Sequence, residues 1–261
     1  MQNNMMRLLV DIGNSTTVMA VAKGDGSIES TWRFKTQKNG TEFFFRTEIM
    51  EGLTPRNIAP EQIERVVISS VVPEVKEEIS EAIVSITDEA PHFFSVADAK
   101  GVMDIDVESP SQLGNDRIAD AIGAVACYGA PVIVFDLGTA TTVGVVNEER
   151  CFLGGMIIPG VKTSFSALTS RASQLPIINI EKPKHIIGRN TIECMQSGVI
   201  HGTAAMIDGI VERLLPTFES SEVNIVATGG MSKQIVPHCT HHIIVEPHLQ
   251  FKGIFHATKN I

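Results

Sequence analysis

The stretch DIGNSTTVMAV at residues 11–21 returns 125 residues later as DLGTATTVGVV at residues 136–146, with identical residues at six of the eleven positions. Each copy follows an apolar run that is typical of a buried strand, at residues 8–10 and 132–135. The offset is close to half of the 261-residue chain. The repeat therefore predicts two related halves that each begin with the same supersecondary unit.

The repeated unit is predicted to be a β-hairpin with a carboxylate at its tip. A strand ends at Asp11 in the first copy and at Asp136 in the second, and the glycine two residues later permits a tight turn. A β-branched run follows in each copy, at residues 16–18 and 141–143, and is typical of the returning strand.

The apolar spacing of the remaining chain predicts strands that alternate with helices. The expected elements are strands at 28–34, 65–72, 150–158 and 223–227 and helices at 41–53, 73–88, 111–128 and 190–215. Strands that pair first as hairpins and then through helices indicate an α/β sheet in each half. The helix at 111–128 is expected near the junction of the halves.

Composition limits the classes of function. The chain has 43% hydrophobic and 20% charged residues, which is typical of a globular protein with a packed core and excludes extensive disorder. Its formal net charge of −9 disfavours binding to nucleic acid or an anionic membrane, so small molecules are the expected partners. The sequence shows no apolar run of about 18 residues, no signal-peptide pattern at its start and no CxxC pair. We therefore expect a cytoplasmic protein with reduced thiols.

Each hairpin tip is a candidate phosphate site. A carboxylate, turn amides and hydroxyl groups presented to one point suit a phosphate and its hydrated cation. For one such turn alone an ordinary Asp-Gly hairpin is an equally good interpretation, and the duplication favours a phosphate site. The sequence lacks a P-loop, a GxGxxG turn, protein-kinase signatures and a GxSxG elbow. Residues 227–230 (ATGG) end a predicted strand, and their bare backbone allows close approach of a flat ligand such as adenine.

Asp116 is the candidate for acid–base chemistry. It follows Gly114 in the first turn of the predicted middle helix, where the helix N-terminus favours an ionised carboxylate. Such a carboxylate can accept the proton of an alcohol that attacks a γ-phosphate, and the alternative is an Asp that only caps the helix. Arg117 beside it can pair with a substrate carboxylate or phosphate, or form a solvated salt bridge.

The paired hairpins with a late Gly-Gly resemble the actin, hexokinase and Hsp70 ATPase superfamily, in which two ribonuclease-H-like domains bind ATP. Five motifs narrow the resemblance to the type III pantothenate kinase family: DIGNST at 11–16, GNDR at 114–117, DLGTATT at 136–142, GGMIIPG at 154–160 and NTIECMQSG at 190–198. The resemblance implies a duplicated, actin-like α/β fold with mixed sheets flanked by helices. Its domains would be residues 1–118, with the first phosphate loop, and residues 119–261, with the second phosphate loop and the adenosine motif.

The same resemblance implies ATP-dependent phosphorylation of pantothenate to 4′-phosphopantothenate, the first step of coenzyme A synthesis, by a homodimer. Mg²⁺ would accompany ATP, and a monovalent cation, K⁺ or NH₄⁺, would bind at Asp136. Asp116 would be catalytic, and Thr139 would contact the nucleotide. The first phosphate loop would comprise Asp11, Ile12, Gly13, Asn14, Ser15, Thr16, Thr17 and Val18. Pantothenate would contact Gly114, Asn115, Asp116, Arg117 and Thr191.

The sequence departs from the family pattern next to the middle motif. Asn115 stands where family members often have alanine, and residues 107–109 (VES) precede Pro110 where an aromatic residue and an asparagine are common. These departures concern the shape of the pantothenate pocket.

Two other functions stay open. One is another enzyme of the superfamily, such as a sugar or acetate kinase or a polyphosphate-cleaving phosphatase, against which stand the GNDR and NT…SG motifs. The other is a nucleotide-binding regulator without catalysis. Against it stand Asp11, Asp116 and Asp136 and the acidic charge of the chain.

Overall fold

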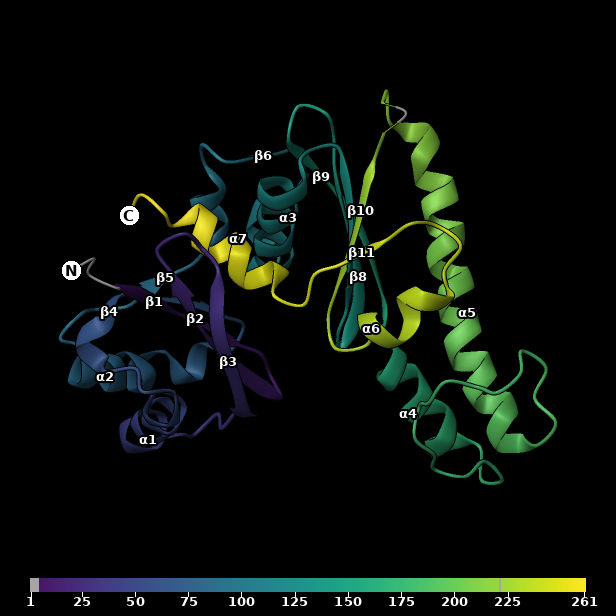
Figure 1. Ribbon diagram of the computed structural model, residues 1–261, viewed down its shortest axis with the longest axis horizontal. Coiled ribbons are helices and arrows are strands. Elements are labelled where there is room, and N and C mark those ends of the chain that lie inside the picture. The colour runs from purple at the N-terminus through teal and green to yellow at the C-terminus, as the bar shows by residue number, and fades with distance from the viewer. Residues whose placement is uncertain (1–4, 221) are drawn as a thin grey trace. The chain divides into compact units, whose positions relative to one another are not determined.

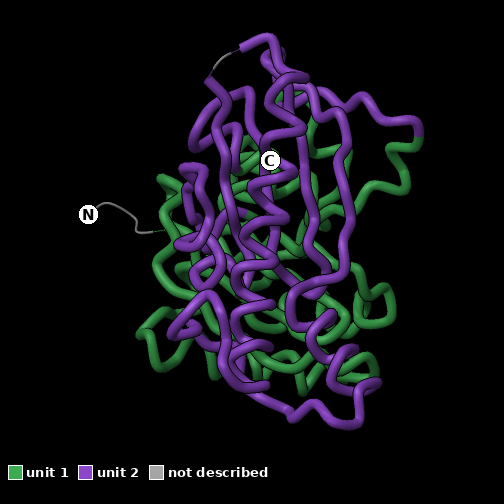
Figure 2. The backbone as a smooth tube through the Cα atoms, turned by 90° about the vertical axis from the view of Figure 1, so that its right-hand side faces the viewer, with its two compact units in different colours: residues 1–102, 109–123, 250–261 green, residues 103–108, 124–249 purple. Residues whose placement is uncertain are grey.

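The computed structural model describes residues 5–220 and 222–261, and the chain forms two compact units. Residues 1–4, which begin both the predicted first domain and the segment without a signal-peptide pattern, lie outside the described residues. Unit 1 comprises Met1–Val102, Ser109–Gly123 and Gln250–Ile261, and unit 2 comprises Met103–Glu108 and Ala124–Leu249 (Figure 2). The units interleave along the chain, because the C-terminal residues return to unit 1. A domain boundary between residues 118 and 119 stays a prediction.

Unit 1 is built on a five-stranded mixed sheet with the strand order β3-β2-β1-β4-β5. β1 (Met6–Ile12) pairs antiparallel with β2 (Thr16–Lys23) and parallel with β4 (Ile63–Ser70). β3 (Ile28–Lys35) and the short β5 (His92–Phe93) lie at the edges. The helices of this unit are α1 (Glu42–Leu53), α2 (Lys76–Thr87), the first turns of α3 (Asn115–Tyr128) and α7 (Leu249–Ala257) (Figure 1).

The alternation of side chains along β1 divides them between the two faces of the unit 1 sheet. Leu8, Val10 and Ile12 lie in the core that α1 and α2 close, and all three are fully buried. Arg7 and Asp11 consequently point to the opposite face, which carries α3 and α7 (Figure 1). The acid at the hairpin tip is thus turned away from the main core of the unit.

Unit 2 contains a six-stranded sheet with the strand order β11-β10-β7-β8-β9-β6. Its strands are β6 (Asp104–Ile105), β7 (Val132–Leu137), β8 (Ala140–Val146), β9 (Cys151–Pro159), β10 (Asn224–Thr228) and β11 (Ile244–Val245). The long helix α5 (Thr191–Leu214) packs Ile200, Ala204 and Ile207 against the sheet (Figure 1). α4 (Val161–Arg171) follows β9, and the short α6 (Ser232–Ile235) follows β10.

Most of the predicted elements are confirmed, and the differences have local causes. The helix expected from residue 111 begins at Asn115, because Pro110–Gln112 form a 3₁₀ turn and Leu113 is extended. The strand expected at 65–72 runs from Ile63 to Ser70. The pattern missed α4, α7 and the short strands β5, β6 and β11. No helix within the described part of the chain is both long and apolar enough to cross a membrane.

Both hairpins form as the repeat predicts, but their registers differ by one residue. Ile12 pairs with Thr17 in unit 1, whereas Leu137 pairs with Thr141 in unit 2. Residues 13–16 therefore connect the first pair, and residues 138–140 connect the second. Because side chains alternate along a strand, a shift of one residue changes which threonine of the Thr-Thr pair points inward. Thr17 and Thr141 are the fully buried members of the two pairs.

Candidate active site

The first predicted phosphate loop connects β1 to β2 and divides into buried and exposed residues. Gly13 N donates a hydrogen bond of 3.1 Å to Thr16 O, which closes the turn. The side chains between these two, at residues 14 and 15, are exposed, and so is that of Thr16. Ile12 and Thr17 are buried, and Val18 is half-buried. The exposed side chains and the turn backbone are therefore the parts of the predicted loop that a phosphate can reach.

Asp11 lies next to the end of β1, and its carboxyl group is shielded from water. Gln250 Nε2, from α7, donates a hydrogen bond of 2.9 Å to Asp11 Oδ1. Burial raises the pKa of the Asp11 carboxyl from 3.8 to about 7; the Gln250 bond acts in the opposite direction, and the charge of Asp116 adds to the rise. A strongly raised carboxyl pKa beside a second carboxylate is a common property of functional sites.

Asp116 lies in the first turn of α3, as predicted. Its Oδ1 accepts a hydrogen bond of 2.9 Å from the backbone N–H of Arg117. A Cβ atom at position 114 would overlap the Asp116 carboxylate, so Gly114 leaves the room that this side chain occupies. Two of the three aspartates that the sequence analysis singled out, Asp11 and Asp116, belong to unit 1, and the charge of Asp116 adds to the raised pKa of the Asp11 carboxyl.

The neighbours of Asp116 in the GNDR motif have distinct environments. Asn115 Nδ2 donates a hydrogen bond of 3.1 Å to Phe94 O, which ties the start of α3 to the chain just after β5. Arg117 is half-buried, and burial lowers the pKa of its guanidinium while the charge of Asp116 opposes that shift. The guanidinium remains a cation at neutral pH, because arginine starts from a far higher pKa.

The second hairpin, in unit 2, carries Asp136 and Thr139. The side chain of Thr139 is exposed, and its carbonyl oxygen accepts hydrogen bonds from Gly160 N at 3.2 Å and Thr163 Oγ1 at 2.7 Å. Gly229 has a φ of 85°, and a Cβ atom there would overlap Asp136 Oδ1. The ATGG turn after β10 is therefore packed against the second acidic tip, and only glycine fits at position 229.

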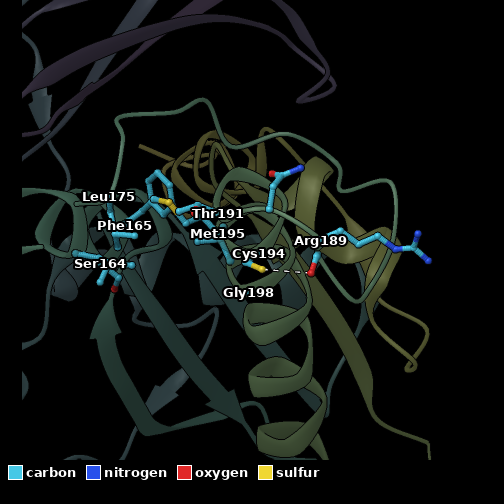
Figure 3. A pocket seen from close by; sticks show the side chains of 12 residues that line it. Ser164, Phe165, Leu175, Arg189, Thr191, Cys194, Met195 and Gly198 are labelled. Atoms are coloured by element: carbon cyan, nitrogen blue, oxygen red, sulfur yellow. Dashed lines mark hydrogen bonds between the residues drawn. The ribbon is translucent and has the colours of Figure 1, made fainter. Parts of the chain in front are cut away.

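Thr191, the predicted substrate contact, is the first residue of α5 and lines a cavity. Asn190 caps the helix by accepting a hydrogen bond of 2.9 Å from Glu193 N. The cavity has a volume of about 750 Å³ and an apolar wall that includes Phe165, Leu175 and Met195 (Figure 3). Its polar groups come mainly from the start of α5, so a ligand with one polar end suits it.

Gln250 is the site residue that the sequence analysis missed. It lies far beyond the last motif, and 239 positions separate it from its partner Asp11. Only the apolar spacing of residues 249–255 (LQFKGIF) could have indicated a C-terminal helix there, and no pattern marks its glutamine.

The residues of this site fit a hydrated divalent cation that a nucleotide brings. The described residues hold no group of three or more His, Cys, Asp or Glu side chains that could bind a metal by themselves. Mg²⁺ commonly binds through one or two carboxylates, phosphate oxygens and several waters. The carboxylates of Asp11 and Asp116 supply oxygen donors of that kind, and a bound cation would favour the ionised form of Asp11, whose carboxyl pKa is raised by burial.

Three solved structures resemble the chain over nearly its whole length. A protein from Campylobacter jejuni described as a Baf family transcriptional activator has a TM-score of 0.58 and 19% identity, covering 97% of this chain and 100% of its own. The activator of 2-hydroxyisocaproyl-CoA dehydratase from Clostridium difficile, with bound ADPNP, has a TM-score of 0.59 and 13% identity, covering 98% and 93%. Component A of (R)-2-hydroxyglutaryl-CoA dehydratase from Acidaminococcus fermentans has a TM-score of 0.60 and 14% identity, covering 98% and 96%. At these identities the likeness shows the fold alone.

Each of the two mixed sheets contains a β-hairpin with an aspartate next to its turn. Together with these structural neighbours, this arrangement defines an actin-like ATPase fold. Residues 7–213, well over half of the chain, match the family model described as type III pantothenate kinase. The chain belongs to the type III pantothenate kinase family, and the protein is an enzyme of the kinase class.

Proposed function

We propose that this protein transfers the γ-phosphoryl group of ATP to the primary hydroxyl of pantothenate and so forms 4′-phosphopantothenate. The observation that carries the proposal is the match of residues 7–213 to this kinase family, and it is supported by Asp11 and Asp116 of unit 1, where the charge of Asp116 adds to the raised pKa of the Asp11 carboxyl. One acid ends the first phosphate loop, and the other begins a helix. Phosphoryl transfer needs both a charged nucleotide site and a group that receives the alcohol proton.

Asp116 acts as the general base in this proposal. The attacking hydroxyl must lose its proton as its oxygen bonds to the γ-phosphorus, and the carboxylate of Asp116 accepts that proton. It lies in the first turn of α3, where its Oδ1 accepts a hydrogen bond from the backbone N–H of Arg117. Arg117 pairs with the carboxylate of pantothenate, and Gly114 and Asn115 complete this side of the substrate site. Their close spacing on one turn supports a joint role.

The nucleotide is bound by the two hairpins. Asn14, Ser15 and Thr16 offer exposed groups on the first loop, and Thr139 offers an exposed hydroxyl on the second. Bound Mg²⁺ supplies charge neutralisation of the triphosphate, and Asp11 contacts its water shell. We assign the monovalent cation, K⁺ or NH₄⁺, to Asp136, where the tight approach of Gly229 supports a preformed site.

Thr191 contacts the substrate from the start of α5. Its exposed position beside an apolar cavity of about 750 Å³ supports this role, because pantothenate joins polar ends through an aliphatic middle. The matched variants Thr191→Val and Thr191→Ser separate the hydroxyl from the shape of the side chain. Removal of the hydroxyl should raise the KM for pantothenate and leave the KM for ATP unchanged.

The enzyme acts as a homodimer in this proposal. Unit 2 exposes large apolar side chains on α4, at the start of α5 and in the loop between them, namely Leu168, Ile177, Ile186, Ile187 and Ile192. Apolar side chains that gather in one segment are typical of protein–protein contacts. Sedimentation should give a dimer mass for the wild type and a monomer for Ile186→Glu/Ile187→Glu. Phe43→Glu, at an equally exposed phenylalanine of unit 1, is the matched control and should remain dimeric.

The direct test supplies the purified protein with Mg²⁺-ATP and pantothenate and follows ADP release and 4′-phosphopantothenate by mass spectrometry. Glucose, acetate and polyphosphate serve as competing substrates, and each reaction is repeated in K⁺, NH₄⁺ and Na⁺. Product with pantothenate alone, faster in K⁺ or NH₄⁺, is the expected result. Turnover of another acceptor would favour a different kinase of this fold, and nucleotide binding without any turnover would favour a regulator.

A further inference from the structure

Helix α7 runs antiparallel along β1 and is bonded to it at both ends. Near its start, Gln250 Nε2 donates to Asp11 Oδ1 at 2.9 Å. Near its end, the guanidinium of Arg7 donates to Thr258 O at 2.8 Å and to Lys259 O at 3.2 Å. The same guanidinium lies over the ring of Phe255, 5.2 Å from its centre. The helix that closes the chain is therefore fixed to the strand that ends in the first acid.

The bonded residues are spaced by similar distances along β1 and along α7. Arg7 and Asp11 are four residues apart on β1, which spans about 13 Å at the rise of a strand. Gln250 and Thr258 are eight residues apart on and just after α7, which spans about 12 Å at the rise of a helix. Because these spans agree, both bonds form at once without bending the helix, and Gln250 is held at a fixed height opposite Asp11.

The same helix is also packed tightly on α3, which carries Asp116. A Cβ atom at position 253 would overlap Ala119 O, so the two helices cross in backbone contact at Gly253. Ile254 and Phe255, the next two residues of α7, are also buried. α7 thus touches both elements that carry the acids of unit 1, by a hydrogen bond to one acid and by backbone packing against the helix of the other.

We propose that Gln250 is a positioning residue of the nucleotide site, whose amide fixes the Asp11 carboxylate in the orientation in which it meets the water shell of Mg²⁺-ATP. This inference rests on the proposed role of the first hairpin in nucleotide binding. The bond occupies Oδ1 of Asp11 and leaves Oδ2 for other partners. Within the described residues of unit 1, Gln250 from α7 bonds to Asp11, Asp116 from α3 acts on it through its charge, and the strand neighbours Val18 and Ser69 carry no charge. The family match ends at residue 213, so it assigns no role to this helix.

The alternative is that the bond only anchors α7, and binding with and without the metal separates the two. Gln250→Met keeps the length of the side chain and removes the donor, and Lys259→Met replaces an exposed charged side chain just after the same helix. Calorimetry measures the affinity of each protein for ATP in the presence of Mg²⁺ and in EDTA, and circular dichroism measures thermal unfolding. Gln250→Ala removes the same donor without placing new atoms and is the second variant if methionine disturbs the helix.

We expect Gln250→Met to weaken Mg²⁺-ATP binding by about 10-fold, the usual size of one hydrogen bond to a charged group, and metal-free ATP binding by less than about 2-fold. In kinetic assays the KM for Mg²⁺-ATP should rise with little change in kcat or in the KM for pantothenate. Lys259→Met should match the wild type in both conditions.

Equal weakening with and without Mg²⁺, or no change in either, would overturn the inference and leave Gln250 an anchor of α7. The proposed function and the role of Gln250 can be refuted independently of each other. A wild type that binds Mg²⁺-ATP but does not phosphorylate pantothenate refutes the assigned reaction, while the binding data still decide the role of Gln250. A wild type that phosphorylates pantothenate, with a Gln250→Met variant of unchanged affinity, refutes only the positioning role.

Discussion

Thr17 and Thr141 occupy the same place in the two hairpins, each across from the residue that follows the acidic tip, although the sequence repeat aligns Thr141 with Thr16. Thr17 pairs with Ile12, Thr141 pairs with Leu137, and both threonines are fully buried. The repeat has the same length in both copies, so the difference arises in the turns. A turn of one residue less in unit 2 moves the second threonine run by one position.

The hydroxyl groups of these two threonines have different surroundings. Thr17 Oγ1 lies 2.9 Å from Thr36 Oγ1, which in turn donates to Gly13 O at 2.7 Å. In unit 2 the residue just after the third strand is Gly160, which has no side chain to offer. Thr141 Oγ1 has no hydrogen-bond partner among the described residues. One hairpin is closed by a chain of hydroxyl groups, and the other contains a buried hydroxyl group alone.

Valine substitutions at the two threonines should therefore differ in their effect on stability. Thr17→Val removes a buried hydrogen bond and leaves Thr36 with one partner fewer, so we expect a loss of about 1 kcal/mol or more in the free energy of unfolding. Thr141→Val replaces an unpaired buried hydroxyl by a methyl group and should be neutral or stabilising. Urea denaturation of the nucleotide-free protein measures both. Equal losses would mean that Thr141 has a partner, such as a bound water.

Gly229→Ala should destabilise unit 2. The left-handed φ of 85° costs a residue with a Cβ about 1–2 kcal/mol, and the new atom would overlap the Asp136 carboxylate. We expect a total loss of about 2 kcal/mol or more, together with weaker activation by K⁺. Gly230→Ala is the matched control, because a Cβ atom there would meet nothing within 4 Å. Similar denaturation midpoints for the two variants would contradict the packing of the ATGG turn on Asp136.

Much of the fold follows from the repeat, because it contains both the strand pattern and the turn residues of each hairpin. The acidic tips and the place of Asp116 in the first turn of α3 were predictable for the same reason. The register difference was not, since the spacing of the threonines is identical in both copies and only the geometry of the turn decides which one points inward.

Two further features could not be derived from local patterns. α4 has the sequence VKTSFSALTSR, whose many hydroxyl residues are more typical of a loop, and it buries only Val161 and Phe165. The bond between Gln250 and Asp11 depends on how α7 packs against β1 and α3. A contact between residues so far apart in the sequence depends on the fold of the whole unit, so no local motif at either residue predicts it.

Asp11→Asn should make the protein more stable at high pH. The pKa of Asp11 is raised from 3.8 to about 7, first by burial and then by Asp116, with the Gln250 bond opposing. The folded state thus binds the proton more tightly than the unfolded state. The stabilisation is complete below about pH 4 and is lost as the pH rises to about 7, a difference of about 4 kcal/mol for three pKa units.

Asparagine carries no charge, so the stability of the variant does not fall with the ionisation of residue 11. Chemical denaturation without nucleotide or divalent cation should show an advantage of Asp11→Asn over the wild type of up to about 4 kcal/mol at pH 8, shrinking as the pH falls toward 4. The same variant should use Mg²⁺-ATP poorly, because the proposed contact to the cation's water shell is weakened. An advantage that does not depend on pH would show that Asp11 titrates normally in the folded protein.

Asp116→Asn should lower kcat by about 10²-fold or more, the usual contribution of a general base, and leave the KM for Mg²⁺-ATP within about 2-fold. Asparagine has the same shape and can still accept the hydrogen bond from Arg117 N, so the start of α3 should be preserved. Asp88→Asn is the matched control, since Asp88 is exposed and asparagine also tolerates its left-handed φ of 58°. Steady-state kinetics with pantothenate as the varied substrate measure the effect. If Asp116→Asn turned over as fast as Asp88→Asn, the proton would have to leave by another route, and Asp116 would be a cap of α3 rather than a catalytic residue.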